Sequence, residues 1–136
     1  MACVDTNVLL DLLGRGGRQA HLRARRRMDE LEATGEDLVT TRLNLAELYV
    51  GVHLAAAPER ELAAISDLSA DFDVLEFDDG AARAFGRIQA YLRRRGTPIG
   101  DMDTLIAAIA MANGHGLVTS NTRHFAAIPG LTLVGY

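Results

Sequence analysis

Three acidic residues, far apart in the sequence, have the type and the surroundings that a metal-dependent active site requires. Asp5 follows a short apolar run, Glu47 lies among apolar residues at helical spacing, and Asp103 opens a very apolar helical segment. Carboxylates that converge repel each other, so a fold that gathers them commonly does so to hold a hard cation such as Mg²⁺. We therefore predict metal-dependent cleavage of a phosphodiester, with RNA as the preferred substrate.

The first site residue is Asp5, in the segment Val-Asp-Thr-Asn near the N-terminus. The ligand site of a parallel sheet lies at the carboxyl ends of its strands, so an acid placed where a strand ends points into that crevice. Thr6 and Asn7 are then expected to orient the carboxylate by hydrogen bonding, as groups around a metal ligand usually do. Capping of the next helix by Asp5, Thr6 or Asn7 explains this segment equally well.

Glu47 is the second candidate because its side chain shares a helical face with Leu43, Val50 and Leu54. Glutamate is seldom buried without a partner or a metal ion. A glutamate at the edge of the apolar stripe, with its carboxylate in solvent, is an equally good interpretation. Asn44, one turn earlier, is interpreted as a helix start rather than as a site residue.

The segment from Ile99 to Gly114 contains two further candidate acids. Asp103 shares a helical face with apolar residues that we expect to be buried, which are Ile106, Ala107, Ala110 and Met111. Asp101 is better placed as the N-cap of the helix, with Thr104 three residues later, and is the second choice as a metal ligand. Alternatively, both acids serve only the helix macrodipole, an effect of ~0.3 to 1 kcal/mol.

Polar residues also follow an apolar run late in the sequence. Thr119, Ser120 and Asn121 carry oxygen atoms but no charge, so any cation that they contact is held mainly by the acids. We predict Asn121 as a weak or water-mediated ligand and Thr119 as a supporting residue, whereas a turn is the better explanation of Ser120. His124 either contacts a substrate phosphate or is an ordinary surface residue.

The site residues need elements that bring them to one edge, and the sequence pattern predicts such elements. Short apolar runs alternate with longer helical patterns, which is typical of βαβ units and a parallel sheet. We expect strands at residues 1–4, 37–41, 73–77, 117–120 and 131–134. Helices are expected at residues 6–13, 18–34, 43–56, 58–70, 79–95 and 102–113, with a short helical turn around Arg123. Asp78 or Asp79 caps the helix that Gly96 ends.

Length and composition fit one globular domain over residues 1–136. Hydrophobic residues make up 49% of the chain and aromatic residues only 5%, so we expect a core of aliphatic side chains. No apolar run approaches the ~20 residues of a membrane-spanning helix and no signal peptide is apparent, which predicts a cytoplasmic protein without membrane association. The single cysteine, Cys3, is expected to be a small core residue.

The absence of lysine excludes several classes of enzyme, since all 14 basic residues are arginine. Phosphorylated receiver domains and haloacid-dehalogenase phosphatases also gather acids beside a parallel sheet, but both classes depend on a lysine. A P-loop nucleotidase is excluded as well, because its glycine-rich loop ends in lysine followed by Ser or Thr.

Arginine is concentrated in two blocks, although the net charge of the chain is -4. One block extends from Arg15 to Arg27 and the other covers residues 93–95. Such blocks are suited to phosphate binding, and we predict Arg15, Arg18 and Arg123 as RNA contacts. Alternatively, these residues form solvated helix faces that are partly paired with nearby acids.

The order of these motifs resembles the PIN domain family of ribonucleases, in particular the VapC toxins of bacterial and archaeal toxin–antitoxin pairs. The resemblance rests on four segments: Val-Asp-Thr-Asn, Asn-Leu-Ala-Glu-Leu-Tyr-Val-Gly, Pro-Ile-Gly-Asp-Met-Asp-Thr-Leu-Ile-Ala-Ala and Leu-Val-Thr-Ser-Asn-Thr-Arg-His-Phe. The conserved acids of the family map onto Asp5, Glu47 and Asp103. Its fourth, often acidic position maps onto Asn121, an amide that is also seen there in the family.

The resemblance implies a single three-layer α/β/α domain with a central parallel sheet, usually a homodimer, that acts as an endoribonuclease. It implies that Asp5, Glu47 and Asp103 bind Mg²⁺ or Mn²⁺, that a metal-activated water attacks the RNA, and that a cognate antitoxin silences the enzyme. The alternative is a catalytically silent PIN-fold module that binds RNA or protein. The complete acidic trio favours the enzyme over that module.

Overall fold

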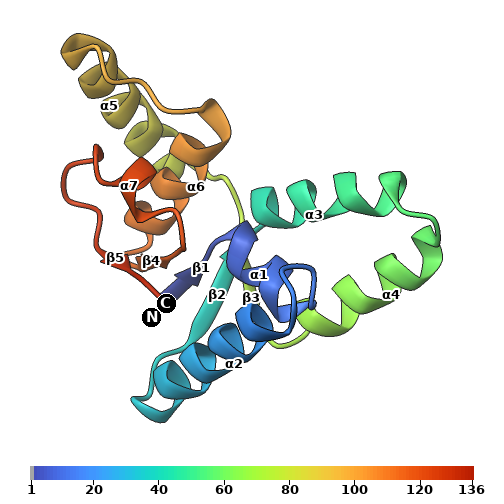
Figure 1. The fold of residues 1–136 in the computed structure, drawn as a ribbon. Coiled ribbons are helices and arrows are strands. Elements are labelled where there is room, and N and C mark those ends of the chain that lie inside the picture. Colours follow the sequence, from blue (N-terminus) through green and yellow to red (C-terminus); the bar gives the residue numbers. More distant parts are fainter. Residues whose placement is uncertain (1) are drawn as a thin grey trace.

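Five short parallel strands form the middle layer of the fold, and helices cover both faces (Figure 1). The computed structural model describes residues 2–136, so Met1, where we expected the first strand to begin, lies outside the described residues. The strands are β1 (Ala2–Val4), β2 (Leu38–Thr41), β3 (Asp73–Leu75), β4 (Gly116–Val118) and β5 (Leu133–Val134). Neighbouring strands pair in parallel in the order β3-β2-β1-β4-β5, which confirms the predicted parallel sheet.

The helices follow the predicted order, with small shifts at their ends. They are α1 (Thr6–Leu12), α2 (Arg18–Ala33), α3 (Arg42–Leu54), α4 (Pro58–Ser69), α5 (Asp79–Arg95), α6 (Asp101–Ala112) and α7 (Thr122–Phe125). The larger differences concern three strands, because β3 stops at Leu75, β4 stops at Val118, and β5 begins only at Leu133, where it pairs with Leu117 of β4. From residue 2 onward, no helix combines the length and the apolar character that crossing a bilayer requires.

The two faces of the sheet support two separate hydrophobic cores. Successive side chains of a strand point to opposite faces. Ala2 and Val4 therefore pack with residues of α1–α4, whereas Cys3, between them, packs with residues of α5–α7. Figure 1 shows the same division, with α1–α4 on one side of the sheet and α5–α7 on the other. This arrangement confirms the predicted three-layer α/β/α architecture.

Cys3 is a core residue, as its place in the sequence predicted. Its side chain is fully buried, and burial, followed by the charge of Asp5, raises the pKa of its thiol to about 12. Because the thiolate is the reactive form of cysteine, a thiol that stays protonated at neutral pH is chemically inert.

Polar side chains cap the starts of α3 and α5. α3 begins with a capping box, in which the Thr41 hydroxyl accepts from the Asn44 backbone N–H and the Asn44 side chain accepts from the Thr41 backbone N–H. The sequence left two candidates for the cap of α5, and the structure selects Asp78, which accepts from the Ala81 N–H at 2.9 Å. At the other end of α5, Gly96 adopts φ +66°, a left-handed conformation that suits glycine.

The strand order determines where a site can form. The chain builds β1, β2 and β3 outward in one direction and then returns to add β4 and β5 on the other side of β1. The crevice beyond the carboxyl ends of the strands at such a change of direction, here β1 and β4, is the usual ligand site of an open parallel sheet. The residues that follow these two strands are Asp5 and Thr119.

Candidate active site

Asp5 lies in a hydrogen-bond network at the carboxyl ends of β1 and β4, and only 5% of it is exposed. One carboxylate oxygen accepts a hydrogen bond from the Thr6 backbone N–H at 2.9 Å, and the other accepts from the Thr119 hydroxyl at 2.8 Å. The first contact makes Asp5 the N-cap of α1. The second contact ties Asp5 to the neighbouring strand, so capping accounts for only one of its two oxygens.

Asn44, which we interpreted only as a helix start, also binds Asp5. Its side chain is fully buried and donates to Oδ1 of Asp5 at 3.2 Å and to the Thr6 hydroxyl oxygen at 2.9 Å. A sequence signal was available, because Asn44 lies one helical turn before Glu47 and therefore shares its face. The cap of α3 and the candidate site have this residue in common.

Glu47 reaches the same network from α3. The Thr6 hydroxyl donates to Oε1 of Glu47 at 2.5 Å. We expected the apolar helix face that carries Glu47 to be buried. This prediction is wrong, because Val50 and Leu54 are 60% and 82% exposed. The buried face of α3 consists instead of Asn44, Leu45, Leu48 and Val52. Glu47 lies at the border of that face and is partly exposed.

Asp103 enters from the first turn of α6, on the other side of the sheet from α3. The face predicted for it is largely buried, since Ile106, Ala107 and Ala110 are inaccessible to solvent. Oδ2 of Asp103 lies 2.8 Å from Nδ1 of His124, which is an ion pair when the imidazole is protonated. His124 is therefore a direct neighbour of a predicted site residue, which the sequence alone did not indicate.

Asp101 has a different environment, although it lies only two residues before Asp103. The N-cap of α6 is Gly100 and not Asp101 as predicted, because the helix begins one residue earlier than expected. Asp101 is exposed, and its carboxylate accepts a hydrogen bond from the Gln89 side chain of α5 at 2.9 Å. Asp101 therefore links two helices, and no contact joins it to the other acids within residues 2–136.

The predicted supporting residues Asn7 and Thr119 meet at the end of β4. Thr119 is fully buried, and its hydroxyl oxygen lies 3.5 Å from the Asn7 side-chain nitrogen. The Asn7 side-chain oxygen lies 3.5 Å from the Ser120 backbone nitrogen. These long contacts hold the start of α1 against the loop after β4, and Thr119 in turn donates to Asp5.

Asn121 lies beside the pair formed by Asp103 and His124. Its backbone N–H donates to the Thr119 hydroxyl oxygen at 3.0 Å, and its side-chain nitrogen lies 3.1 Å from Nδ1 of His124. A single imidazole nitrogen cannot donate to Asp103 and accept from Asn121 at the same time. The orientation of the Asn121 amide therefore depends on the protonation of His124.

The three acids act on one another electrostatically. Burial raises the pKa of Asp5, hydrogen bonds to its carboxylate oppose that rise, and the charge of Asp103 adds to it. Burial is also the main cause of the raised pKa of Glu47, which the hydrogen bond from Thr6 opposes and the charges of Asp5 and Asp103 increase. The structure therefore brings the predicted trio within range of mutual repulsion.

The oxygen atoms of these residues suit a hard divalent cation, although the three carboxylates do not converge on one position. In the part of the chain that the structure describes, no group of three His, Cys, Asp or Glu side chains is arranged to hold a metal ion. Glu47 is held by Thr6 instead, and Asp103 by His124. Carboxylate, hydroxyl and amide oxygens are nevertheless the ligands that Mg²⁺ and Mn²⁺ prefer. Asp103 would have to turn away from His124 to join such a cation, whereas Glu47 has one oxygen that Thr6 does not bind.

The three arginines that we predicted as RNA contacts lie in different surroundings. Arg15 follows α1 and forms an ion pair with Glu61 of α4. Arg18 is the exposed first residue of α2. Arg123, in α7, is also exposed and has no hydrogen-bond or ion-pair partner among the described residues. Arg123 precedes His124 in α7, and His124 contacts Asp103.

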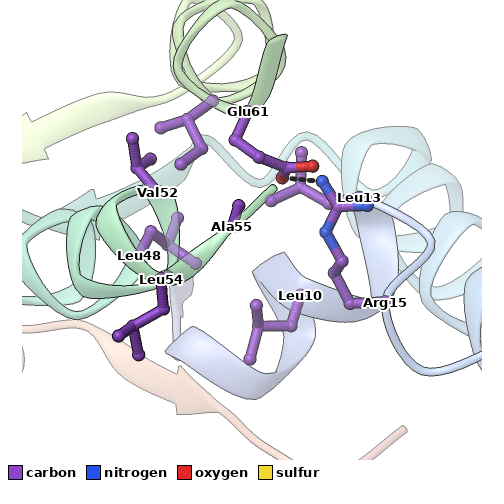
Figure 2. Close-up of a pocket in the computed structure, with 10 residues that line it drawn as sticks. Leu10, Leu13, Arg15, Leu48, Val52, Leu54, Ala55 and Glu61 are labelled. Carbon is purple, nitrogen blue, oxygen red and sulfur yellow. Dashed lines mark hydrogen bonds and ion pairs between the residues drawn. The ribbon is translucent and has the colours of Figure 1, made fainter. Parts of the chain in front are cut away.

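A separate apolar groove of about 420 Å³ lies between α1, α3 and α4. Figure 2 shows Leu10, Leu48 and Leu54 along this groove, with the ion pair of Arg15 and Glu61 at its rim. Leu54, one of the apolar residues that we had expected on the face of Glu47, is 82% exposed and borders this groove instead. Exposed apolar surface of this kind commonly marks an interaction site.

Comparison with known proteins gives a consistent result. Residues 2–131 match the family model of the PIN domain. The tRNA(fMet)-specific endonuclease VapC of Salmonella typhimurium is 41% identical over 91 residues, which cover 67% of this chain and 69% of the relative. The ribonuclease VapC19 of Mycobacterium tuberculosis is 33% identical over 131 residues, which cover 96% of this chain and 97% of the relative.

Solved structures share the fold. A chain of DNA-bound VapBC from Salmonella typhimurium is 31% identical and superposes with a TM-score of 0.85, covering 98% of this chain and 96% of that chain. VapBC-5 from Mycobacterium tuberculosis, a member of the VapBC family of toxin–antitoxin systems, contains a chain that is 33% identical with a TM-score of 0.62, covering 72% of this chain and 79% of that chain.

The raised pKa of Glu47 predicts that Glu47→Gln stabilises the metal-free protein at neutral pH. A carboxyl group with a higher pKa in the folded than in the unfolded state favours folding while it is protonated, and this contribution is lost as the pH rises through the folded pKa. Glutamine removes the charge but keeps an oxygen for the Thr6 hydroxyl. In EDTA, we expect the variant to melt a few degrees above wild type at neutral pH, with a gap that closes below pH ~4.3, the ordinary pKa of glutamate.

The matched control is Glu59→Gln, an exposed glutamate in the first turn of α4. This control should leave the melting temperature of the metal-free protein unchanged at both pH values. If Glu47→Gln also leaves the melting temperature unchanged at neutral pH, neither burial nor the neighbouring carboxylates destabilise the Glu47 charge.

Proposed function

Because this chain belongs to the PIN domain family, we propose that it is an endoribonuclease and the toxin of a toxin–antitoxin pair. Relatives that cover nearly the whole chain are ribonucleases of the VapC type. The observation that carries the proposal is the hydrogen-bond network that joins Asp5 and Glu47 through Thr6 where β1 and β4 end, close enough to Asp103 for its charge to add to the raised pKa of both acids. Acids whose surroundings disfavour the charged form, and so raise the pKa, are characteristic of functional sites.

The three acids differ in how firmly the protein holds their carboxylates, and we assign them different roles. Asp5 is fixed, since donors hold both of its oxygens, and it provides a constant anchor for the site. Glu47 is partly exposed and one of its oxygens is bound to Thr6, so the other oxygen is free to accept a proton from the attacking water. Asp103 contacts His124, and its carboxylate would join the cation site when that contact opens.

We infer that these three acids hold a divalent cation, Mg²⁺ or Mn²⁺. When bound, such a cation supplies the Lewis acidity that phosphodiester hydrolysis needs. Asn121 offers an amide oxygen in place of a fourth charge and therefore adds only a weak ligand. Asp101 is engaged by Gln89 and adds none.

The alternative is a catalytically silent PIN-fold module that binds RNA or protein. Such a module gains nothing from a buried carboxylate whose charged form is disfavoured by burial and by a neighbouring acid, as that of Asp5 is. Donors from three separate elements, those carrying Thr6, Asn44 and Thr119, stabilise the Asp5 charge. This support for the ionised state favours the enzyme.

An antitoxin protein is the partner that we propose for the groove between α1, α3 and α4. The related VapBC-5 belongs to a toxin–antitoxin system, and this groove exposes apolar side chains such as Leu54. An amphipathic helix lays its apolar face into a groove of this kind, and the pair of Arg15 and Glu61 offers it a polar rim. The homodimer and the cytoplasmic location implied by the sequence stay predictions.

The first test is the loss of RNA cleavage in Asp5→Asn and in Asp103→Asn. Either change removes an acid that we assign to the cation, and we expect the cleavage rate to fall by at least ~100-fold, since even residues that only support a metal ligand contribute about 10- to 100-fold. The rate is measured on a pool of cellular RNA with Mg²⁺, beside a melting curve that shows the fold to be intact. Asp101→Asn is the matched control on the same helix and should cleave like wild type. Full activity in Asp5→Asn would exclude the proposed site.

A second test uses the stabilisation that a bound ion gives to the folded state. Mg²⁺ should raise the melting temperature of wild type, because the cation relieves the repulsion among the acids. The rise should be smaller in Glu47→Gln, which has one charged ligand fewer. The same upward shift in both proteins would mean that the ion binds elsewhere, and Mn²⁺ serves as a parallel probe.

A third test separates the groove from the active site. Leu54→Glu places a charge on the apolar surface and should weaken binding of a co-expressed antitoxin from a neighbouring gene, without lowering RNA cleavage. Leu62→Glu is the control, since Leu62 is an exposed leucine of α4 that does not line the groove. Equal co-purification of the antitoxin with wild type and with Leu54→Glu would place its binding surface elsewhere.

A further inference from the structure

A second hollow, of about 350 Å³, lies between the loop that joins α5 to α6 and the short helix α7. Its lining residues are Thr97, Pro98, Ile99, Asn121, Arg123, His124 and Ala127. Pockets for small ligands span roughly 300 to 1,000 Å³. The hollow is therefore large enough for a ligand the size of one nucleotide but too small for a folded partner.

Two of the lining residues connect this hollow to the acids. Nδ1 of His124 lies 2.8 Å from the Asp103 carboxylate, and the Asn121 backbone donates to the hydroxyl of Thr119, which in turn donates to Asp5. The hollow thus opens directly beside the proposed catalytic edge. A group bound in the hollow and a phosphodiester at the acids can belong to the same molecule.

Arg123 supplies a free positive charge at this place. Its side chain is exposed and has no hydrogen-bond or ion-pair partner within residues 2–136. The acids alone repel an approaching RNA backbone, and a cation beside them offsets that repulsion. A guanidinium also pairs with two phosphate oxygens at once, or stacks on the face of a base.

The other lining residues match the chemistry of an unpaired base. Pro98, Ile99 and Ala127 offer apolar contact to the faces of a base, and Ile99 is itself packed against the second core, so this wall is firmly placed. Thr97 and Asn121 add a hydroxyl and an amide that can reach the polar edge of the base. Sequence-specific RNA recognition uses this combination of face contacts and edge hydrogen bonds on single-stranded nucleotides.

We propose that this hollow binds one unpaired base of the RNA, next to the scissile phosphate, while Arg123 contacts the backbone of that nucleotide. This proposal rests on the proposed ribonuclease function. The hollow is then the part of the enzyme that selects where RNA is cut. The acids, which touch only the phosphodiester, carry no information about sequence.

The test is a double-mutant cycle between the protein and the RNA. After the cleavage site is mapped, short RNAs are made that lack the base on one or the other side of the scissile bond. We expect wild type to lose about 10-fold in kcat/KM when the base on one side is absent, in line with the contribution of single stacked bases. Ile99→Ala, which trims the wall that contacts the base, should be slower on the intact RNA and lose little more on the RNA without that base. Arg123→Gln should be slower on both RNAs by a similar factor, because the RNA without the base keeps the backbone that Arg123 contacts.

Arg60→Gln is the matched control, because it removes the same charge from an exposed position on α4 outside the hollow. It should keep the full loss that wild type shows on the RNA without the base. If the losses from Ile99→Ala and from the missing base multiply, if neither flanking base matters to wild type, or if Arg123→Gln cleaves the intact RNA as fast as wild type does, the proposal is wrong.

Two measurements separate failure of this proposal from failure of the nuclease function. Wild type that cleaves no RNA, or Asp5→Asn that cleaves it equally well, would overturn the function and not the hollow. Hydrolysis of bis(p-nitrophenyl) phosphate, which has no base, should be unchanged in Ile99→Ala. Melting curves show whether Ile99→Ala, which removes a partly buried side chain, is folded, and the exposed Arg123→Gln provides a variant that loses no packing.

Discussion

The burial of negative charge at the end of β1 is the constraint on which the rest of this structure depends. An isolated carboxylate is strongly disfavoured away from water, and Asp5 is almost completely buried with another acid nearby. Hydrogen bonds from Thr6, Asn44 and Thr119 offset that cost, and they come from α1, α3 and the end of β4. The Asp5 carboxylate is compensated only when these three elements are assembled, so the fold and the site depend on each other.

Groups that complete the secondary structure also build the site. Asp5 caps α1 with one oxygen and binds Thr119 with the other. Asn44 closes the capping box of α3 and donates to Asp5. Because helix starts expose backbone N–H groups that need acceptors, polar side chains already gather at these points. A parallel sheet brings several helix starts to one edge, which explains why these polar side chains lie together there.

The three proposed sites are built from different parts of the fold. The acids lie on the ends of regular elements, whose packing fixes their positions. The hollow beside Arg123 is built from the α5–α6 loop and from α7, and loops of this kind are free to vary without disturbing the sheet. The groove bordered by Leu54 lies on the outer surfaces of helices. Catalysis, choice of RNA and silencing by a partner can therefore change independently.

The sequence by itself determined the elements, their order and the parallel sheet, because hydrophobic periodicity and the βαβ rule are local properties. It also placed Asp5 at a strand end and Asp103 on the face of a buried helix. The prediction that Asp5, Glu47 and Asp103 form the site rests on the same reasoning, since each position follows from the element that carries it.

Only the tertiary structure decided which side chains meet. The pairing of His124 with Asp103, the binding of Asp101 by Gln89 and the second role of Asn44 join elements that are distant in sequence, so no local pattern contains them. The exposure of Leu54 was missed for a related reason. Periodicity shows that a helix face is apolar, but whether the same chain covers that face depends on where the neighbouring helices pack.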